Sequence, residues 1–191
     1  RADADADLPL THAQRHDVAM TVRRVLLATA LVVTAAVVQV TLVNPWHLPG
    51  GGPDLVLLVV VSLAVVQGPL AGAVTGFFAG LLVDLLPPAS GYVGLWALVL
   101  CVAGYLAGLL RSDTRRSAGA LVAAVAGLSA LAVLGYAGLA MLFGVPGGTW
   151  DELTSVLIGT VLYDLLLAPF VVPAVMGLAR RAEPDLSRMP L

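Results

Sequence analysis

Apolar residues fill this chain in six long runs, which are separated by short breaks rich in glycine, proline and charged residues. We predict that each run forms a helix, because the breaks carry turn residues and no run could serve as a barrel strand. The predicted helices cover residues 25–43, 54–67, 69–86, 92–110, 117–143 and 153–178. They form one domain over residues 22–180. Residues 1–21 are then a disordered polar tail or an upstream extension, and residues 181–191 are a second tail.

Composition identifies this helical chain as a membrane protein. Of its 191 residues, 59% are hydrophobic and 12% are charged, and the mean hydropathy is +0.96. Soluble domains carry about 25% charged residues, and a globular chain of this size could not hide so much apolar surface from water. The predicted fold class is therefore an all-α integral membrane protein whose helices contact lipid.

The second run is short, and the positions of the arginines decide how it is placed. Residues 55–66 rise only about 18 Å as a helix, against roughly 30 Å for a hydrocarbon core. If residues 55–86 crossed the membrane once, Arg111 would lie on the side opposite Arg24. A tight turn at Gln67-Gly68-Pro69 instead places all ten cations, which are arginines, on one face. Because basic residues collect on the cytoplasmic side, we predict six transmembrane helices with both termini in the cytoplasm.

Small residues recur every fourth position in the third run, in the order Gly68, Gly72, Gly76, Gly80 and Asp84. Four residues turn an α-helix by about 400°, so this stripe drifts by about 40° at each step. Such a stripe is typical of a right-handed crossing in which two helix backbones approach closely. Gly104 and Gly108 repeat the spacing in the fourth run. The stripe predicts either packing between helices of this chain or a groove that binds a partner protein.

Two carboxylates lie within apolar runs. Asp84 is close to the end of the third run, where it is either a helix-end anchor or part of a site. Asp164 is near the middle of the last run, beside Tyr163 and one turn before Pro169, whose ring frees a backbone carbonyl. A charge at mid-membrane costs roughly 3 kcal/mol on insertion scales. We therefore expect Asp164 to face the interior of the bundle and to be neutral or hydrogen-bonded, and we treat Tyr163 and Asp164 as intramembrane polar candidates.

The sequence offers little for catalysis. An intramembrane aspartyl protease would need two membrane aspartates, but such enzymes usually carry a Gly-x-Gly-Asp motif, whereas Asp84 follows Gly80-Leu-Leu-Val. His47 is the only histidine outside the N-terminal tail and Cys101 is the only cysteine, which leaves no metal site and no nucleophilic pair. There is no lysine, no nucleotide-binding loop and no dense cluster of cations. We predict no enzyme activity, no cofactor, no metal and no nucleic-acid partner.

Several short motifs between residues 70 and 111 together resemble the MreD family of rod shape-determining proteins. The family pattern is a Gly-Phe-x-x-Gly-Leu-x-x-Asp helix, a short turn, a Gly-Leu-x-Ala start and a Gly-Tyr-x-x-Gly-x-x-Arg end. The matching residues are Gly76, Phe77, Gly80, Leu81, Asp84, Gly94, Leu95, Ala97, Gly104, Tyr105, Gly108 and Arg111. Pro53-Asp54 also matches, as does Tyr163 with Leu167-Ala168-Pro169, and the resemblance extends over residues 22–180. Asp164 departs from it, because an uncharged polar residue such as asparagine is expected there.

The resemblance implies a non-enzymatic subunit of the bacterial cell-elongation machinery in the cytoplasmic (inner) membrane. Such a subunit would bind MreC and, through it, support MreB filaments and the peptidoglycan synthases, which are a RodA-type polymerase and a class B penicillin-binding protein. The family fold is similar to that of the substrate-binding subunits of energy-coupling-factor transporters, and a small-molecule-binding subunit of such a transporter is the alternative. Its ligand pocket would draw chiefly on the polar residues of the predicted outer loops, Asn44, His47, Thr149, Asp151 and Glu152. Ala35-Ala36 is the candidate for the small alanine motif that engages the coupling subunit.

Overall fold

The computed structural model describes residues 12–43, 45, 50–86, 93–114, 117–144 and 149–181, and within these ranges it contains helices and no strands. The fold class is therefore all-helical, as the apolar runs predict. The elements are α1 (His12–Val38), a π-helical turn η1 (Gln39–Val43), α2 (Leu55–Gln67), α3 (Pro69–Leu85), α4 (Leu95–Leu109), α5 (Arg111–Thr114), α6 (Ala118–Leu142) and α7 (Trp150–Arg181).

The boundaries of α4 and α7 differ from the predicted ones by at most three residues, and two differences are larger in kind. The first helix begins at His12, so residues 12–21 are helical although they precede the apolar run. Five of its ten residues favour helix, namely two alanines, a glutamine, an arginine and a methionine, and an apolar helix can extend into such a sequence beyond the membrane. The second difference is α5, a single turn within the break that was predicted to be only a loop.

Helix length divides the bundle into two groups. By length and composition, three helical stretches can cross a membrane: Thr21–Val43, Gly119–Leu142 and Trp150–Arg181. The other three helices, α2, α3 and α4, are apolar but shorter. The lengths therefore indicate a helical membrane protein with three candidate spanning helices. Six crossings remain a prediction, because α2, α3 and α4 are shorter than a usual span.

The short helix α2 is the centre of the bundle. Every residue from Val56 to Val66 is buried, and the helix packs against α1, α3, α4 and α7. A helix that is apolar on all sides requires such an enclosed position. Its neighbours and not the lipid tails therefore surround most of the surface of α2.

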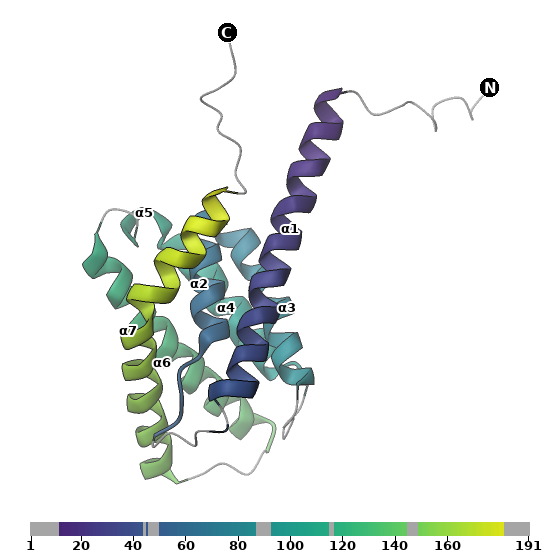
Figure 1. Ribbon diagram of the computed structural model, residues 1–191. Coiled ribbons are helices and arrows are strands. Elements are labelled where there is room, and N and C mark those ends of the chain that lie inside the picture. Colours follow the sequence, from purple (N-terminus) through teal and green to yellow (C-terminus); the bar gives the residue numbers. More distant parts are fainter. Residues whose placement is uncertain are drawn as a thin grey trace, which may run out of the picture.

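A single residue separates α2 from α3. Gly68 has φ +100°, a left-handed backbone conformation that residues with a Cβ atom rarely adopt, and Pro69 starts the next helix. Figure 1 shows that the first turns of α1, the short helix α5 and the last turns of α7 lie at the same end of the bundle. Arg111 belongs to α5 and Arg180 to the last turn of α7, so both lie at this end, and Arg24 of α1 lines a pocket together with Arg111.

The last helix contains two prolines, Pro169 and Pro173. Each removes a backbone N–H donor and crowds the preceding turn, which bends a helix. In Figure 1 the green and yellow parts of α7 run in different directions. The bend lies just after Asp164, the residue around which the polar contacts of the interior gather.

Candidate functional site

The glycine stripe of α3 lies against α4. A Cβ atom on Gly76 would collide with the backbone carbonyl of Leu100, and one on Gly80 would collide with that of Trp96. Gly72 and Gly104 face each other in the same way, because a Cβ atom on either would meet the carbonyl oxygen of the other. The two backbones are therefore in direct contact along the whole stripe.

Gly108 extends this contact to the end of the helix pair. A Cβ atom there would meet the backbone of Pro69, at the first turn of α3. The surfaces of Gly72, Gly76, Gly80, Gly104 and Gly108 are thus covered by helices of this same chain. Glycine is required at these positions by the closeness of the backbones.

Asp84 joins the end of α3 to the start of α4. Its Oδ2 atom accepts hydrogen bonds from the backbone N–H groups of Gly94 (2.8 Å) and Ala97 (3.2 Å), and its Oδ1 atom accepts one from Trp96 (3.3 Å). The first N–H groups of a helix have no partner within the helix, and a carboxylate also complements the helix dipole there. Asp84, at the end of α3, thus caps the next helix, α4, and both of its carboxylate oxygens accept hydrogen bonds.

Asp164 is fully buried at the contact of α2, α6 and α7. Its Oδ1 atom accepts a hydrogen bond of 2.7 Å from the backbone N–H of Asp54, and its Oδ2 atom accepts one of 2.6 Å from the hydroxyl of Ser129. Both carboxylate oxygens therefore have protein donors. The expectation that this side chain faces the interior and is hydrogen-bonded agrees with its position.

The segment before α2 completes this arrangement. Asp54 caps α2, because its Oδ1 atom accepts a hydrogen bond of 3.0 Å from the backbone N–H of Leu57. Gln39, in the π-helical turn, accepts a hydrogen bond of 3.2 Å from the N–H of Val56 through its Oε1 atom. We call Gln39, Asp54, Ser129 and Asp164 the polar centre. It ties η1, the start of α2, α6 and α7 together.

Glycine allows this segment to lie on α7. A Cβ atom on Gly50 would be 2.8 Å from the carbonyl oxygen of Ser155, and one on Gly159 would meet the backbone of Gly50. Residues 50–54, the described end of the glycine-rich break, therefore pack on the last helix. This packing brings the N–H of Asp54 to the carboxylate of Asp164.

The two aspartates singled out from the sequence do not meet. Asp84 binds the start of α4, whereas Asp164 binds Asp54 and Ser129. Tyr163 is half-buried and takes no part in the hydrogen bonds of the polar centre, because one step along a helix turns a side chain by about 100°. The described residues contain no group of three or more histidine, cysteine or acidic side chains that could hold a metal ion.

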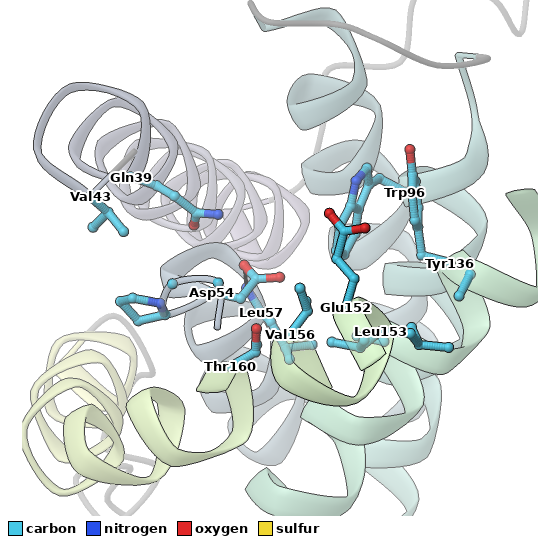
Figure 2. Close-up of a pocket in the computed structure, with 16 residues that line it drawn as sticks. Gln39, Val43, Asp54, Leu57, Trp96, Tyr136, Glu152, Leu153, Val156 and Thr160 are labelled. Carbon is cyan, nitrogen blue, oxygen red and sulfur yellow. Dashed lines mark hydrogen bonds between the residues drawn. The ribbon is translucent and has the colours of Figure 1, made fainter. Parts of the chain in front are cut away.

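A pocket of about 460 Å³ adjoins the polar centre. Figure 2 shows the stacked rings of Trp96 and Tyr136 on one side of it and Gln39 on the other, with Asp54 and Glu152 between them. Glu152 lies in the first turn of α7 and is exposed. Of the outer-loop residues proposed for a ligand pocket, Glu152 lines this one, and Asn44 and His47 lie outside the described residues.

Sequence reasoning missed three members of the polar centre. Asp54 entered only as part of a short motif, and Gln39 and Ser129 were not singled out. Ser129 carries a usable signal, because it is a hydroxyl inside an otherwise apolar run. Nothing in the sequence pairs it with Asp164, since the two residues belong to different helices.

The fold and the polar centre define an all-helical membrane protein whose buried carboxylates connect separate segments of one bundle. The sequence model of the family described as rod shape-determining protein MreD matches residues 20–182. The chain therefore belongs to the MreD family and is a rod shape-determining membrane protein, which confirms the resemblance. Comparison with curated proteins and with solved structures found no match.

Proposed function

We propose that this protein is a non-enzymatic scaffold of the cell-elongation complex, that it binds MreC and that it thereby supports the peptidoglycan synthases. MreB, a RodA-type polymerase and a class B penicillin-binding protein would be indirect partners. Membership of the MreD family supports the proposal most directly. It places this chain among proteins that determine rod shape.

The proposal that the protein is not an enzyme rests on one observation: the buried and half-buried carboxylates already accept hydrogen bonds from the protein. Asp84 accepts three backbone hydrogen bonds, and both oxygens of Asp164 accept hydrogen bonds from the protein. Among the described residues, every buried polar side-chain atom has a partner. A catalytic dyad would instead need two carboxylates that share a water or a proton. Asp84 and Asp164 act on different segments. Asp54 and Asp164 do meet, but through the backbone N–H of Asp54, and each carboxylate has a donor of its own, which favours a structural role.

The proposed topology has six crossings, with both termini in the cytoplasm and the protein multi-pass in the inner membrane. The common end of α1, α5 and α7 and the one-residue turn between α2 and α3 support it. Cysteine labelling in intact cells tests it after Cys101 is replaced. A cysteine at the exposed position Ser112 should resist an impermeant reagent, whereas one at exposed Asp151 should react. Labelling at position 112 from outside would contradict the topology.

Binding of MreC is tested by co-purification and by photo-crosslinking. The glycine stripe is covered by α4, so the contact with MreC should use another apolar surface of the bundle. Photoreactive residues at the exposed positions Leu26, Leu134 and Leu162 sample α1, α6 and α7. We expect a crosslink to MreC from at least one of these faces. We also expect the protein to restore rod shape in a strain depleted of it. Normal rod shape without any association with MreC would contradict the proposal.

One observation favours the alternative, a small-molecule-binding subunit of an energy-coupling-factor type transporter. The pocket beside the polar centre has a volume within the roughly 300–1,000 Å³ of small-molecule sites and combines aromatic and polar walls. Against it, Ala35 and Ala36 are buried in the core and are not presented to a coupling subunit. Mass spectrometry of the protein purified in mild detergent distinguishes the two functions. A bound metabolite that is lost in Glu152→Gln would favour the transporter subunit.

A further inference from the structure

A second, larger hollow lies between α1 and α3, where these helices meet the core. Its volume is about 1,000 Å³. It is lined in part by buried core residues such as Ala28, Val32 and Ala79. The rest of its apolar lining includes side chains that remain exposed in the bundle: Val25, Val33, Leu70, Val74 and Phe78. Phe78 is 63% exposed and Leu70 is 76% exposed. We call this hollow the α1–α3 groove; it faces the surroundings of the bundle and therefore lipid.

Two arginines lie at one end of the α1–α3 groove. Arg24 comes from α1 and Arg111 from α5, and both are exposed. The Nη1 atom of Arg111 would be 3.4 Å from a Cβ atom on Gly68, so its guanidinium lies over the turn between α2 and α3. None of the described residues that line the groove is acidic. The groove thus offers two positive charges that its own walls do not neutralise.

The length of the groove fits one leaflet of a bilayer. It extends along α1 from Thr21 to Val33 and along α3 from Leu70 to Leu82, which is about 18 Å at 1.5 Å per residue. Half of a hydrocarbon core is about 15 Å, and a phosphate group adds a few ångströms. A transmembrane helix of a partner protein would need a groove through both leaflets, and it would not require two cations at one end.

We propose that the α1–α3 groove binds an anionic phospholipid. The phosphate would accept hydrogen bonds from the guanidinium groups of Arg24 and Arg111, which present a planar fork suited to phosphate oxygens. An acyl chain would lie against Val74 and Phe78. Basic pockets between transmembrane helices are a recognised way of holding anionic headgroups. This inference requires only that the protein lies in a membrane, and it goes beyond the scaffold function.

The test is native mass spectrometry of the full chain in a neutral detergent, titrated with phosphatidylglycerol or phosphatidylcholine. Phosphatidylglycerol should bind as a single tight adduct, and phosphatidylcholine should bind more weakly. Arg24→Gln and Arg111→Gln should each weaken the phosphatidylglycerol adduct about fivefold, and the double variant about twenty-fivefold. The matched control is Arg23→Gln, because Arg23 has the same charge on the same helix and does not line the groove.

Two further measurements keep the result interpretable. Thermal unfolding in lipid-free detergent should be the same for all four arginine variants, because the replaced side chains are exposed. Val74→Trp should fill the groove and weaken the adduct while both arginines remain. Equal losses in Arg23→Gln, equal binding of the two lipids, or full binding in Val74→Trp would each overturn the proposal. So would a crosslink from position 78 to a protein helix in place of lipid.

Discussion

The α3–α4 contact and the polar centre hold the same bundle together in opposite ways. Along α3 and α4, glycines remove side chains so that two backbones touch. At the polar centre, side chains reach across gaps: those of Asp164 and Gln39 accept hydrogen bonds from backbone N–H groups, and the hydroxyl of Ser129 donates to Asp164. Lipid tails are as apolar as leucine, so helices in a membrane gain little from burying apolar surface against each other. Close packing and internal hydrogen bonds replace that driving force, and this protein uses each in a separate region.

The two regions should therefore tolerate different changes. The glycine contact depends on shape and should reject any added atom, whatever its polarity. The polar centre depends on donors and acceptors and should accept a different side chain that restores them. Substitutions that change either side-chain size or hydrogen bonding, but not both, test whether the two regions differ in this way.

The largest effect is expected from Gly76→Leu. Already the Cβ atom would collide with the carbonyl of Leu100, which belongs to a helix backbone and cannot rotate away. The helices must separate, and we expect a loss of about 3 kcal/mol in the free energy of unfolding, at the upper end of overpacking. Folded yield and denaturant titration in detergent measure it.

Gly138→Leu is the control for this substitution. Gly138 is an exposed helical glycine of α6 with no atom within 4 Å of a Cβ position. Its replacement should not destabilise the protein and should raise the free energy of unfolding by up to about 1 kcal/mol, because leucine favours helix over glycine. Equal losses at positions 76 and 138 would mean that the glycine stripe is not a close contact.

Asp164→Leu should have the next largest effect. It removes both acceptors, so the buried N–H of Asp54 and the hydroxyl of Ser129 lose their partner. The hydroxyl can turn to a carbonyl of its own helix, but the N–H cannot. We expect a loss of about 2 kcal/mol, the usual cost of one unsatisfied buried donor. The same denaturant titration measures this loss. Unchanged stability would show that the polar centre does not hold α7 in the bundle.

Asp84→Ala should cost about 1 kcal/mol, as the loss of a helix cap usually does. Three N–H groups at the start of α4 lose their acceptor, but Asp84 is only half-buried and water can replace part of the carboxylate. Hydrogen exchange at Gly94, Trp96 and Ala97 should accelerate, while exchange at the end of α4 stays the same. Uniform acceleration along α4 would indicate a wider collapse and not a lost cap.

The smallest effect is expected from Asp164→Asn, below about 1 kcal/mol. The asparagine Oδ1 can accept from the N–H of Asp54, and its amide can donate to the hydroxyl of Ser129, which both donates and accepts. Rod shape should therefore be preserved in a complementation assay. Loss of shape at normal membrane abundance would show that the acid itself is needed, through its charge or its proton.

The sequence predicts the helices better than it predicts their neighbours. Apolar runs and breaks are local features, so they indicate where α2, α3, α4, α6 and α7 occur. A carboxylate in such a run is conspicuous, which is why Asp84 and Asp164 could be singled out. Their partners could not, because Asp54 lies 110 residues from Asp164 and no periodic pattern links the two. The central place of α2 is suggested by its uniform hydrophobicity, but the helices that surround it follow only from the structure.

The distance along the chain between Asp54 and Asp164 also sets an order of events during synthesis. The ribosome delivers α2 early and α7 last, so the N–H of Asp54 has no acceptor until the final helix enters the membrane. Until then, one side of α2 is uncovered and the growing bundle is open at the place that α7 will fill. Insertion of α7 is thus the step that completes the bundle. A chain that ends before it would leave one side of a core helix uncovered and the N–H of Asp54 without its native acceptor.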